Sequence, residues 1–288
     1  MLREWIQEDF SPTNREDVHA ALRQVMQQIA LSGLSRAGFF NQTAFYGGTA
    51  LRIFYNLPRY SEDLEFSLLS PNLNFSLDQY LNALRQECEA YGISVTTRKK
   101  EKLINSQIDS AFINSSTRIQ DLLLQTNSYS PGLKEQVSVK IKLEVDVNPP
   151  LGFNTEERLL LKPYSCYIKC FAPEDLFAGK VHALLYRNWK NRVKGRDWYD
   201  LEWYIRKNVA VNLSHVTQRA IHSGDWNKKH NMSKSDLLTL INARIHEVDF
   251  SQAKADVARF LKDITVLEIW SKSYFLDIID KLKFTSDR

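Results

Sequence analysis

Apolar residues recur along much of the chain at the three- and four-residue spacing that is typical of a helix with one buried face. The first such stripe predicts a helix over residues 14–31, with Asn14 as its N-cap and Gly33 as its stop. The second predicts a helix over residues 75–91, which Gly92 is expected to close. Each helix is amphipathic, so each is expected to pack against other elements of a folded core.

Between and after these helices, apolar and polar residues alternate one by one, which is the period of a half-buried strand. Phe45 and Tyr46 are expected to end a short strand, and residues 64–68 are expected to form another. Further strand-like segments are separated by polar or turn-forming residues, and together they predict a mixed sheet. These segments are residues 94–98, 108–113, 137–147 and 164–171.

The pattern becomes helical after residue 171, where Pro173, Glu174 and Asp175 are typical of the first turn of a helix. We therefore predict two domains, a sheet-containing core over residues 1–171 and a helical C-terminal domain over residues 172–288. The predicted fold class is α+β, a mixed sheet flanked by helices and followed by a helical domain. The later helices are expected near residues 213–222, 233–247, 251–263 and 270–283.

Composition narrows the class of protein without identifying a function. With 288 residues, 43% of them hydrophobic, the chain can bury a substantial core. No apolar run of about 18 residues and no basic, apolar leader is evident, so the chain is predicted to be neither membrane-spanning nor exported. Cys88, Cys166 and Cys170 show no disulfide pattern, and a cytoplasmic location is expected. The net charge of +4 permits binding to nucleic acid.

Candidate chemistry begins at Gly47-Gly48-Thr49. Two successive glycines let the backbone turn sharply and approach a ligand closely, and the apolar residues that follow have helical spacing. Thr49 is therefore expected near a helix N-terminus, where free N–H groups and the helix dipole favour a phosphate. The alternative is that the glycine pair forms an ordinary turn.

Two acids follow at strand spacing, because Asp63 and Glu65 alternate with Leu64 and Phe66. The two carboxylates would lie on one face of a strand, about 6–7 Å apart. Carboxylates in such an arrangement suit Mg²⁺, which proteins that act on phosphates hold with one or two acidic side chains. The alternative is a solvated acidic face with a structural role only.

A third acid is expected on the strand over residues 137–147. Its apolar residues share one face, and its other face carries Glu144 and Asp146. Either acid would then complete a metal site or deprotonate an attacking hydroxyl, and the sequence leaves the choice between them open. The alternative is an edge strand whose polar face meets water.

Basic and aromatic residues gather farther along the chain, between Arg187 and Trp198. Five positive charges fall within ten residues of this segment, so phosphates would be attracted to it. On the preceding helix, Lys180 is either a surface lysine or a phosphate ligand. Asp197 either caps its helix and pairs with neighbouring arginines or takes part in a site, and Asp200 lies on the same face.

Four motifs in this order resemble the AbiEii and MenT nucleotidyltransferase toxins, a branch of the polymerase-β-like nucleotidyltransferase superfamily. The resemblance covers roughly residues 45–205. It implies a nucleotidyltransferase core whose cleft has a helical region as its other wall. The motifs are YGGTALRIFYNLPRYSEDLEFSL, VKIKLEV, DLFAGKVHALLYR and RDWYDL.

The resemblance also implies roles for individual residues. Metal ligands would be Asp63, Glu65 and Glu144, although the family more often has Asp where this chain has Glu65. Asp197 would belong to the catalytic set, as would Lys180, which would also contact the phosphates. The nucleotide would be bound by Gly47, Gly48, Thr49, Arg52, Ser61 and Lys180, and further candidates are Asp146, Arg196 and Asp200, with Arg59 facing the phosphates or supporting the site.

The activity implied by this resemblance is transfer of a nucleoside monophosphate from an NTP to an RNA acceptor, tRNA in particular, with Mg²⁺ or Mn²⁺ as cofactor. Blocking tRNA would inhibit translation and growth, and the partner would be an antitoxin encoded nearby, as in abortive-infection systems. One rival hypothesis is transfer to a small molecule or a protein hydroxyl. Another is a non-catalytic module that binds nucleotides or RNA.

Overall fold

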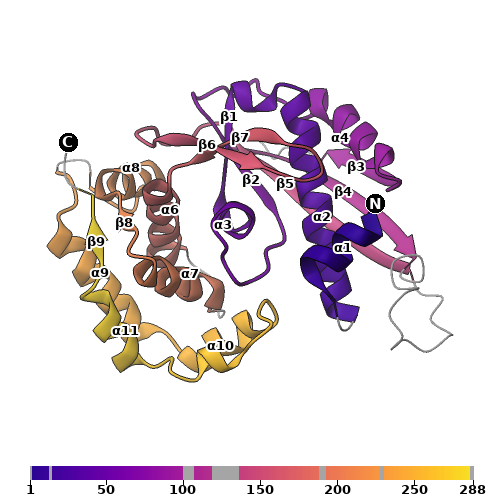
Figure 1. The fold of residues 1–288 in the computed structure, drawn as a ribbon. Helices are drawn as coiled ribbons and strands as arrows, with labels where there is room; N and C mark the ends of the chain where they lie inside the picture. Colours follow the sequence, from indigo (N-terminus) through magenta and orange to yellow (C-terminus); the bar gives the residue numbers. More distant parts are fainter. Residues whose placement is uncertain are drawn as a thin grey trace. The chain divides into compact units, whose positions relative to one another are not determined.

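The computed structural model describes residues 2–12, 15–99, 107–118, 136–187, 193–227 and 230–285. The chain divides into two compact units, which we call the sheet unit and the helical unit (Figure 1). The sheet unit comprises Met1–Phe54, Ser61–Pro149 and Glu157–Cys170, and the helical unit comprises Tyr55–Tyr60, Pro150–Glu156 and Phe171–Arg288.

Seven strands formed by the described residues make one mixed sheet in the order β3-β4-β5-β2-β1-β7-β6. The central strands β2 and β5 are parallel, whereas β1 and β4 run antiparallel to β2 and β5 respectively. The α+β class predicted from the sequence is therefore confirmed. The strands are β1 (Thr43–Tyr46), β2 (Leu64–Leu68), β3 (Val95–Lys99), β4 (Ile108–Arg118), β5 (Gln136–Asp146), β6 (Thr155–Leu160) and β7 (Cys166–Phe171).

The position of β5 removes one alternative that the sequence left open. β5 pairs with β4 on one side and with β2 on the other, so it is an interior strand and not an edge strand. Its residues Val139, Ile141, Leu143 and Val145 are fully buried in the apolar core. The alternation along β5 therefore separates a core face from a second face of the sheet.

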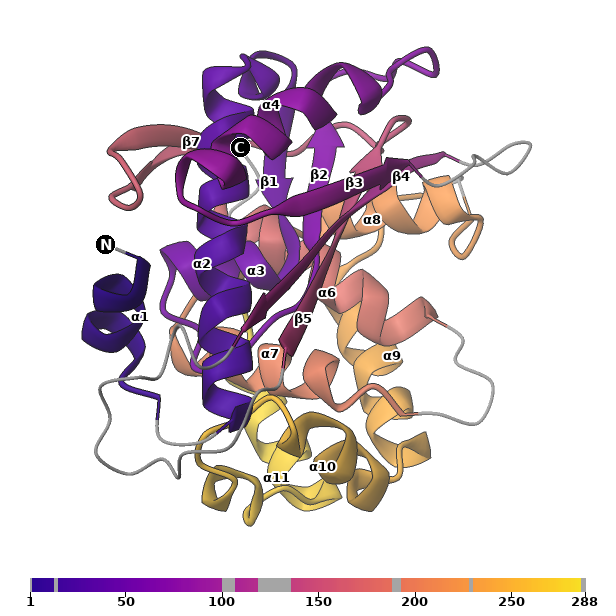
Figure 2. The same ribbon diagram turned by 90° about the vertical axis from the view of Figure 1, so that its right-hand side faces the viewer.

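Helices α1 (Leu2–Phe10), α2 (Arg15–Arg36) and α4 (Asp78–Ala90) belong to the same unit, and α2 packs against both α4 and β5 (Figure 2). The predicted stop of α2 at Gly33 is wrong, because the helix continues to Arg36. A Cβ at Gly33 would lie 2.8 Å from Glu87 Cβ, so the glycine permits close packing of α4. The predicted cap Asn14 lies outside the described residues.

The helical unit is built around α6 (Pro173–Tyr186) and α7 (Gly195–Arg206), which pack against each other. A Cβ at Gly195 would lie 1.9 Å from Ala253 O, so the first residue of α7 must be small to admit α10. The remaining elements are α8 (Leu213–Ser223), α9 (Lys234–Glu247), α10 (Phe250–Ala258), α11 (Lys272–Ile279) and the short parallel pair β8 (Ala210–Val211) and β9 (Lys283–Phe284).

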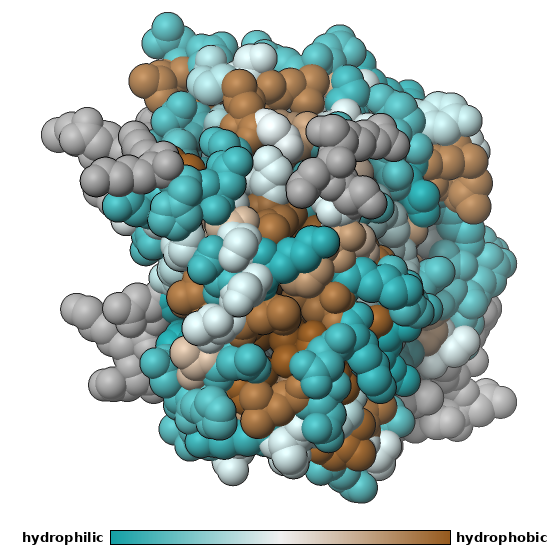
Figure 3. Space-filling view, turned by 90° about the vertical axis from the view of Figure 1, so that its left-hand side faces the viewer, coloured by the Kyte–Doolittle hydropathy of each residue, from teal (hydrophilic) through white to brown (hydrophobic). Residues whose placement is uncertain are grey.

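Apolar residues also reach the surface, and on the face drawn in Figure 3 they lie in separate groups among polar side chains. Among the described residues, no helix has the length and apolar character needed to cross a membrane. The three cysteines are all free thiols.

Candidate functional site

The turn between β1 and α3 (Gly47–Phe54) is closely packed against an acid of β2. Gly47 has φ of +80°, a left-handed conformation that favours glycine. A Cβ at this position would lie 1.8 Å from Glu65 Oε2, so no other residue fits without displacing the carboxylate. The sequence predicts that Gly47 lets a phosphate approach the backbone. In this structure the space beside Gly47 is filled by the carboxylate of Glu65.

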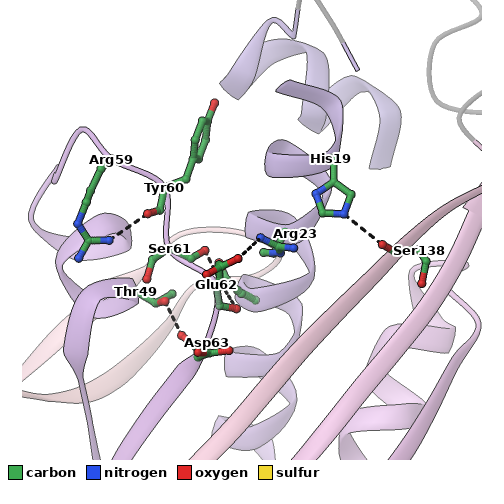
Figure 4. Close-up of polar contacts among 10 residues, drawn as sticks. His19, Arg23, Thr49, Arg59, Tyr60, Ser61, Glu62, Asp63 and Ser138 are labelled. Carbon is green, nitrogen blue, oxygen red and sulfur yellow. Dashed lines mark hydrogen bonds and ion pairs between the residues drawn. The ribbon is translucent and has the colours of Figure 1, made fainter. Parts of the chain in front are cut away.

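Thr49 connects the same turn to the other acid of the pair. Its side chain is buried, and its hydroxyl donates a hydrogen bond of 2.5 Å to the backbone carbonyl of Asp63 (Figure 4). The glycine turn and the start of β2 are thereby held together. In this structure the Thr49 hydroxyl, a predicted nucleotide contact, donates its proton to the Asp63 carbonyl oxygen.

The three candidate metal ligands lie on neighbouring strands. Asp63 immediately precedes β2, and Glu65 lies two residues farther on, so both project to the same side of the strand. In the parallel pairing of β2 and β5, Glu65 is opposite Glu144. Asp146 is opposite Ser67, and its Oδ1 accepts a hydrogen bond from the backbone N–H of Asn148 at 3.1 Å. The register therefore places Glu144, rather than Asp146, beside the acidic pair.

The three acids lie close enough for their charges to affect the pKa of Asp63. The pKa of Asp63 is raised to about 6, mainly by burial and then by the neighbouring carboxylates of Glu65 and Glu144, while Lys142 acts in the opposite direction. Glu144 forms an ion pair with Lys142. An excess of negative charge on partly buried carboxylates is typical of a cation site.

The acids are not assembled as a finished metal centre. Over the described ranges, no group of three or more His, Cys, Asp or Glu side chains is arranged to hold a metal ion. The donor set nevertheless fits a hard divalent cation, because it consists of carboxylate oxygens and its charge is incompletely balanced. Glu144 contacts Lys142 through Oε1, so its other carboxylate oxygen is the one that would face a cation while this ion pair is kept.

Helix α2 holds the loop that leads into β2, a role that the apolar stripe of the helix did not reveal. Gln27 is almost fully buried, and its Nε2 donates to the backbone carbonyls of Ser61 and Glu62 at 3.2 and 3.0 Å. One turn earlier, Arg23 contacts the Glu62 carboxylate at 3.4 Å (Figure 4). On α3, Arg52 Nε donates to Gln24 Oε1 at 2.9 Å. Predicted nucleotide ligands Ser61 and Arg52 are thus tied to α2.

A second polar network lies inside the helical unit. Asp200 is fully buried and receives two hydrogen bonds of 2.6 Å from the Arg59 guanidinium, through Nε and Nη2. Lys180 Nζ lies 2.8 Å from Asp200 Oδ2. Burial alone would raise the pKa of Asp200, but Arg59 and Lys180 outweigh it and lower that pKa to about 2. Asp200 is therefore ionised, and its carboxylate binds the side chains of Lys180 and Arg59.

Asp197 and the basic residues before it form a separate cluster in that unit. Arg187 Nη1 lies 4.0 Å from Asp197 Oδ2. The pKa of Lys194 is lowered to about 8, mainly by burial and then by the charge of Arg187, while Asp197 opposes both effects. Arg196 stacks over the Phe260 ring at 4.2 Å. Residues 188–192, which belong to the predicted basic segment, lie outside the described residues.

The raised pKa of Asp63 predicts a stability effect with a definite sign. The folded protein binds more protons than the unfolded chain between about pH 4 and pH 6, so its stability falls as pH rises through that window. We expect Asp63→Asn to raise Tm at pH 7.5 by about 2–6 °C, without added divalent metal, and to leave it unchanged near pH 4. Thermal unfolding at both pH values measures this. An equal change at both would contradict an electrostatic cause.

Both the sequence and the fold are similar to those of known proteins. A family profile described as nucleotidyl transferase AbiEii toxin, type IV TA system, matches residues 29–277. A presumed nucleotidyltransferase from Helicobacter pylori has a crystal structure with TM-score 0.50 and 16% identity, covering 90% of this chain and 91% of that one. JHP933 from Helicobacter pylori has TM-score 0.41 and 14% identity, covering 91% and 97%. No curated protein matched the chain. At these identities the structural likeness concerns the fold alone.

Proposed function

The chain belongs to the AbiEii nucleotidyl transferase toxin family of type IV toxin–antitoxin systems, and from this premise we propose that it transfers a nucleoside monophosphate from an NTP to RNA. The acceptor we propose is tRNA, whose modification would inhibit translation and growth and so serve abortive infection. The family also implies a cognate antitoxin as partner.

One observation carries this proposal, the pairing of Glu65 with Glu144 beside Asp63 at the glycine turn. Three acids on adjacent strands next to a tight backbone turn suit a phosphate and a divalent cation. Mg²⁺ or Mn²⁺ held by these acids would supply charge stabilisation for the attacking and leaving oxygens. The residues most directly assigned to this role are Asp63, Glu65 and Glu144.

The reaction we propose is in-line displacement at the α-phosphorus. A hydroxyl oxygen of the RNA forms the new P–O bond, the bond to the β-phosphate oxygen breaks, and pyrophosphate leaves. Glu144 is assigned to the acceptor side, where it accepts the hydroxyl proton or completes the ligand set. Gly47, Gly48 and Thr49 are assigned to the triphosphate. The assignments of Lys180 to phosphate and of Asp197 to the catalytic set stay predictions from the family resemblance.

A direct test uses purified protein, Mg²⁺, total tRNA and each of the four NTPs labelled on the α-phosphate. We expect label in RNA with at least one NTP, and none without the divalent cation. Label in a protein or small molecule instead would support the rival acceptor. Absence of transfer to any acceptor with all four NTPs would leave the non-catalytic alternative.

The choice between Glu144 and Asp146 can be tested separately. We expect Glu144→Gln to lower the rate of transfer about a hundredfold or more, because it removes a charged oxygen next to the reacting phosphate. Asp146→Asn should leave the rate within about threefold, since Asp146 lies opposite Ser67 and serves the turn at Asn148. Single-turnover rates with saturating NTP measure both. A larger loss in the Asp146 variant would reverse the assignment.

A further inference from the structure

The face of the sheet that carries the acids continues across β5, β4 and β3 as a strip of basic, aromatic and amide side chains. Phe112 is opposite Lys142 in the register, Asn114 is opposite Lys140, and Arg98 on β3 is opposite Phe112. Neighbouring residues in register project to the same face, so these five side chains share it. We call them the sheet-face strip.

The strip is accessible, in contrast to the opposite face of the same strands. Arg98 and Lys140 are exposed, and the other three members are partly exposed. Residues that alternate with them, such as Ala111 and Ile113 on β4, are buried in the core. The exposure of Phe112 is therefore a property of this face and not of the strand as a whole.

Charge and shape on the strip favour an anionic ligand that has flat rings. Three of the five members carry positive charge, and Lys140 Nζ lies 4.1 Å from the centroid of the Phe112 ring. A partly exposed ring on a sheet, flanked by cations, suits the stacking of a single-stranded base and the binding of its phosphates. Asn114 adds an amide that can hydrogen-bond to a base edge.

The position of the strip relative to the acids indicates that the strip binds the acceptor and not the NTP. Glu144, Lys142 and Lys140 follow one another on one face of β5, so Lys140 is roughly 13 Å from Glu144 along the strand. In the sheet order, β2 and β5 lie between β1, which leads into Gly47, and β4 with β3. The acids are therefore flanked by the glycine turn on one side and by the strip on the other.

We propose that the sheet-face strip binds the single-stranded acceptor end of the RNA, an inference that rests on the proposed function. Phe112 stacks against a base, Arg98, Lys140 and Lys142 contact phosphates, and Asn114 contacts a base edge. The glycine turn is then the donor side of the acids and the strip is the acceptor side.

The test combines two measurements on folded protein. Binding is followed by fluorescence anisotropy with a labelled short single-stranded RNA that has the 3′-terminal sequence of tRNA, and transfer is followed as the KM for tRNA. We expect Phe112→Ala to weaken RNA binding and raise KM about tenfold, and Phe112→Tyr to restore both, because base stacking needs only an aromatic ring. Lys140→Ala should reduce the dependence of log K on log salt concentration by about 0.7.

A matched control is Lys169→Ala, which removes a lysine from β7 of the same sheet and should change neither quantity. The proposal is overturned if Phe112→Ala and Lys140→Ala, folded as judged by circular dichroism, match the wild type in RNA affinity and KM. Failure of the proposed function looks different. In that case the wild type transfers nothing to RNA, while RNA binding that depends on Phe112 would still support the strip.

Discussion

Replacing Asp63 by Ala should abolish nucleotidyl transfer, with a rate loss of about a thousandfold or more. A bound divalent cation stabilises transition-state charge by several kcal/mol, and each 1.36 kcal/mol corresponds to a tenfold change in rate. Asp63 interacts with the other parts of the candidate site, because Thr49 donates a hydrogen bond to its backbone carbonyl and both Glu65 and Glu144 raise the pKa of its carboxyl. Transfer of labelled NMP to RNA measures the loss.

The control for this variant is Asp78→Asn in the same unit. The Asp78 side chain is 57% exposed and pairs with Lys99 at 2.8 Å, and such surface ion pairs contribute little. We expect its transfer rate to stay within about twofold of wild type. Isothermal titration with Mg²⁺ gives a second readout, since Asp63→Ala should lose binding while Asp78→Asn keeps it. Transfer that survives Asp63→Ala would remove Asp63 from the reaction.

Most strands and helices of the described residues could be predicted, because each buries one face and so leaves a period of two or 3.6 in the sequence. For β5, this periodicity predicts the strand itself but not its register with neighbouring strands. Its alternation predicts a strand with Glu144 and Asp146 on one face but does not distinguish the two acids, whereas the register with β2 does. Register depends on which strands become neighbours, and local periodicity does not contain that information.

The same limit explains the elements and contacts that the sequence did not reveal. β6 has three consecutive charged residues, Glu156, Glu157 and Arg158, and lies at the edge of the sheet, so it lacks the alternation of apolar and polar residues that marks a strand. Gln27 looks like any polar helix residue until the loop at Ser61 is seen to receive its hydrogen bonds. The sequence predicts Gly33 as a helix stop, but this glycine is explained by close packing against Glu87, a residue 54 positions away. The roles of Gln27 and Gly33 therefore depend on contacts between residues far apart in the sequence, and β6 is recognised only by its place in the sheet.

Asp200→Ala should destabilise the helical unit by about 3–5 kcal/mol, the typical cost of leaving a buried charge without its partner. Arg59 is 1% exposed and donates two hydrogen bonds to Asp200, so the variant would leave a buried guanidinium charge without its carboxylate partner. Urea unfolding followed by tryptophan fluorescence reports mainly on this unit, because five of the six tryptophans lie after residue 171.

The pH dependence gives the Asp200 prediction a second signature. The lowered pKa of Asp200 means that its contribution is complete above about pH 4, the ordinary range of an unfolded aspartate, and is lost as pH falls toward 2. The gap between wild type and Asp200→Ala should therefore narrow below pH 4. Lys180→Met is the matched comparison, because it keeps the Arg59–Asp200 pair and should cost only about 1–2 kcal/mol. If Lys180→Met destabilised the unit more than Asp200→Ala, the carboxylate would not be the centre of the network, and the dominant interaction would have to be sought around Lys180.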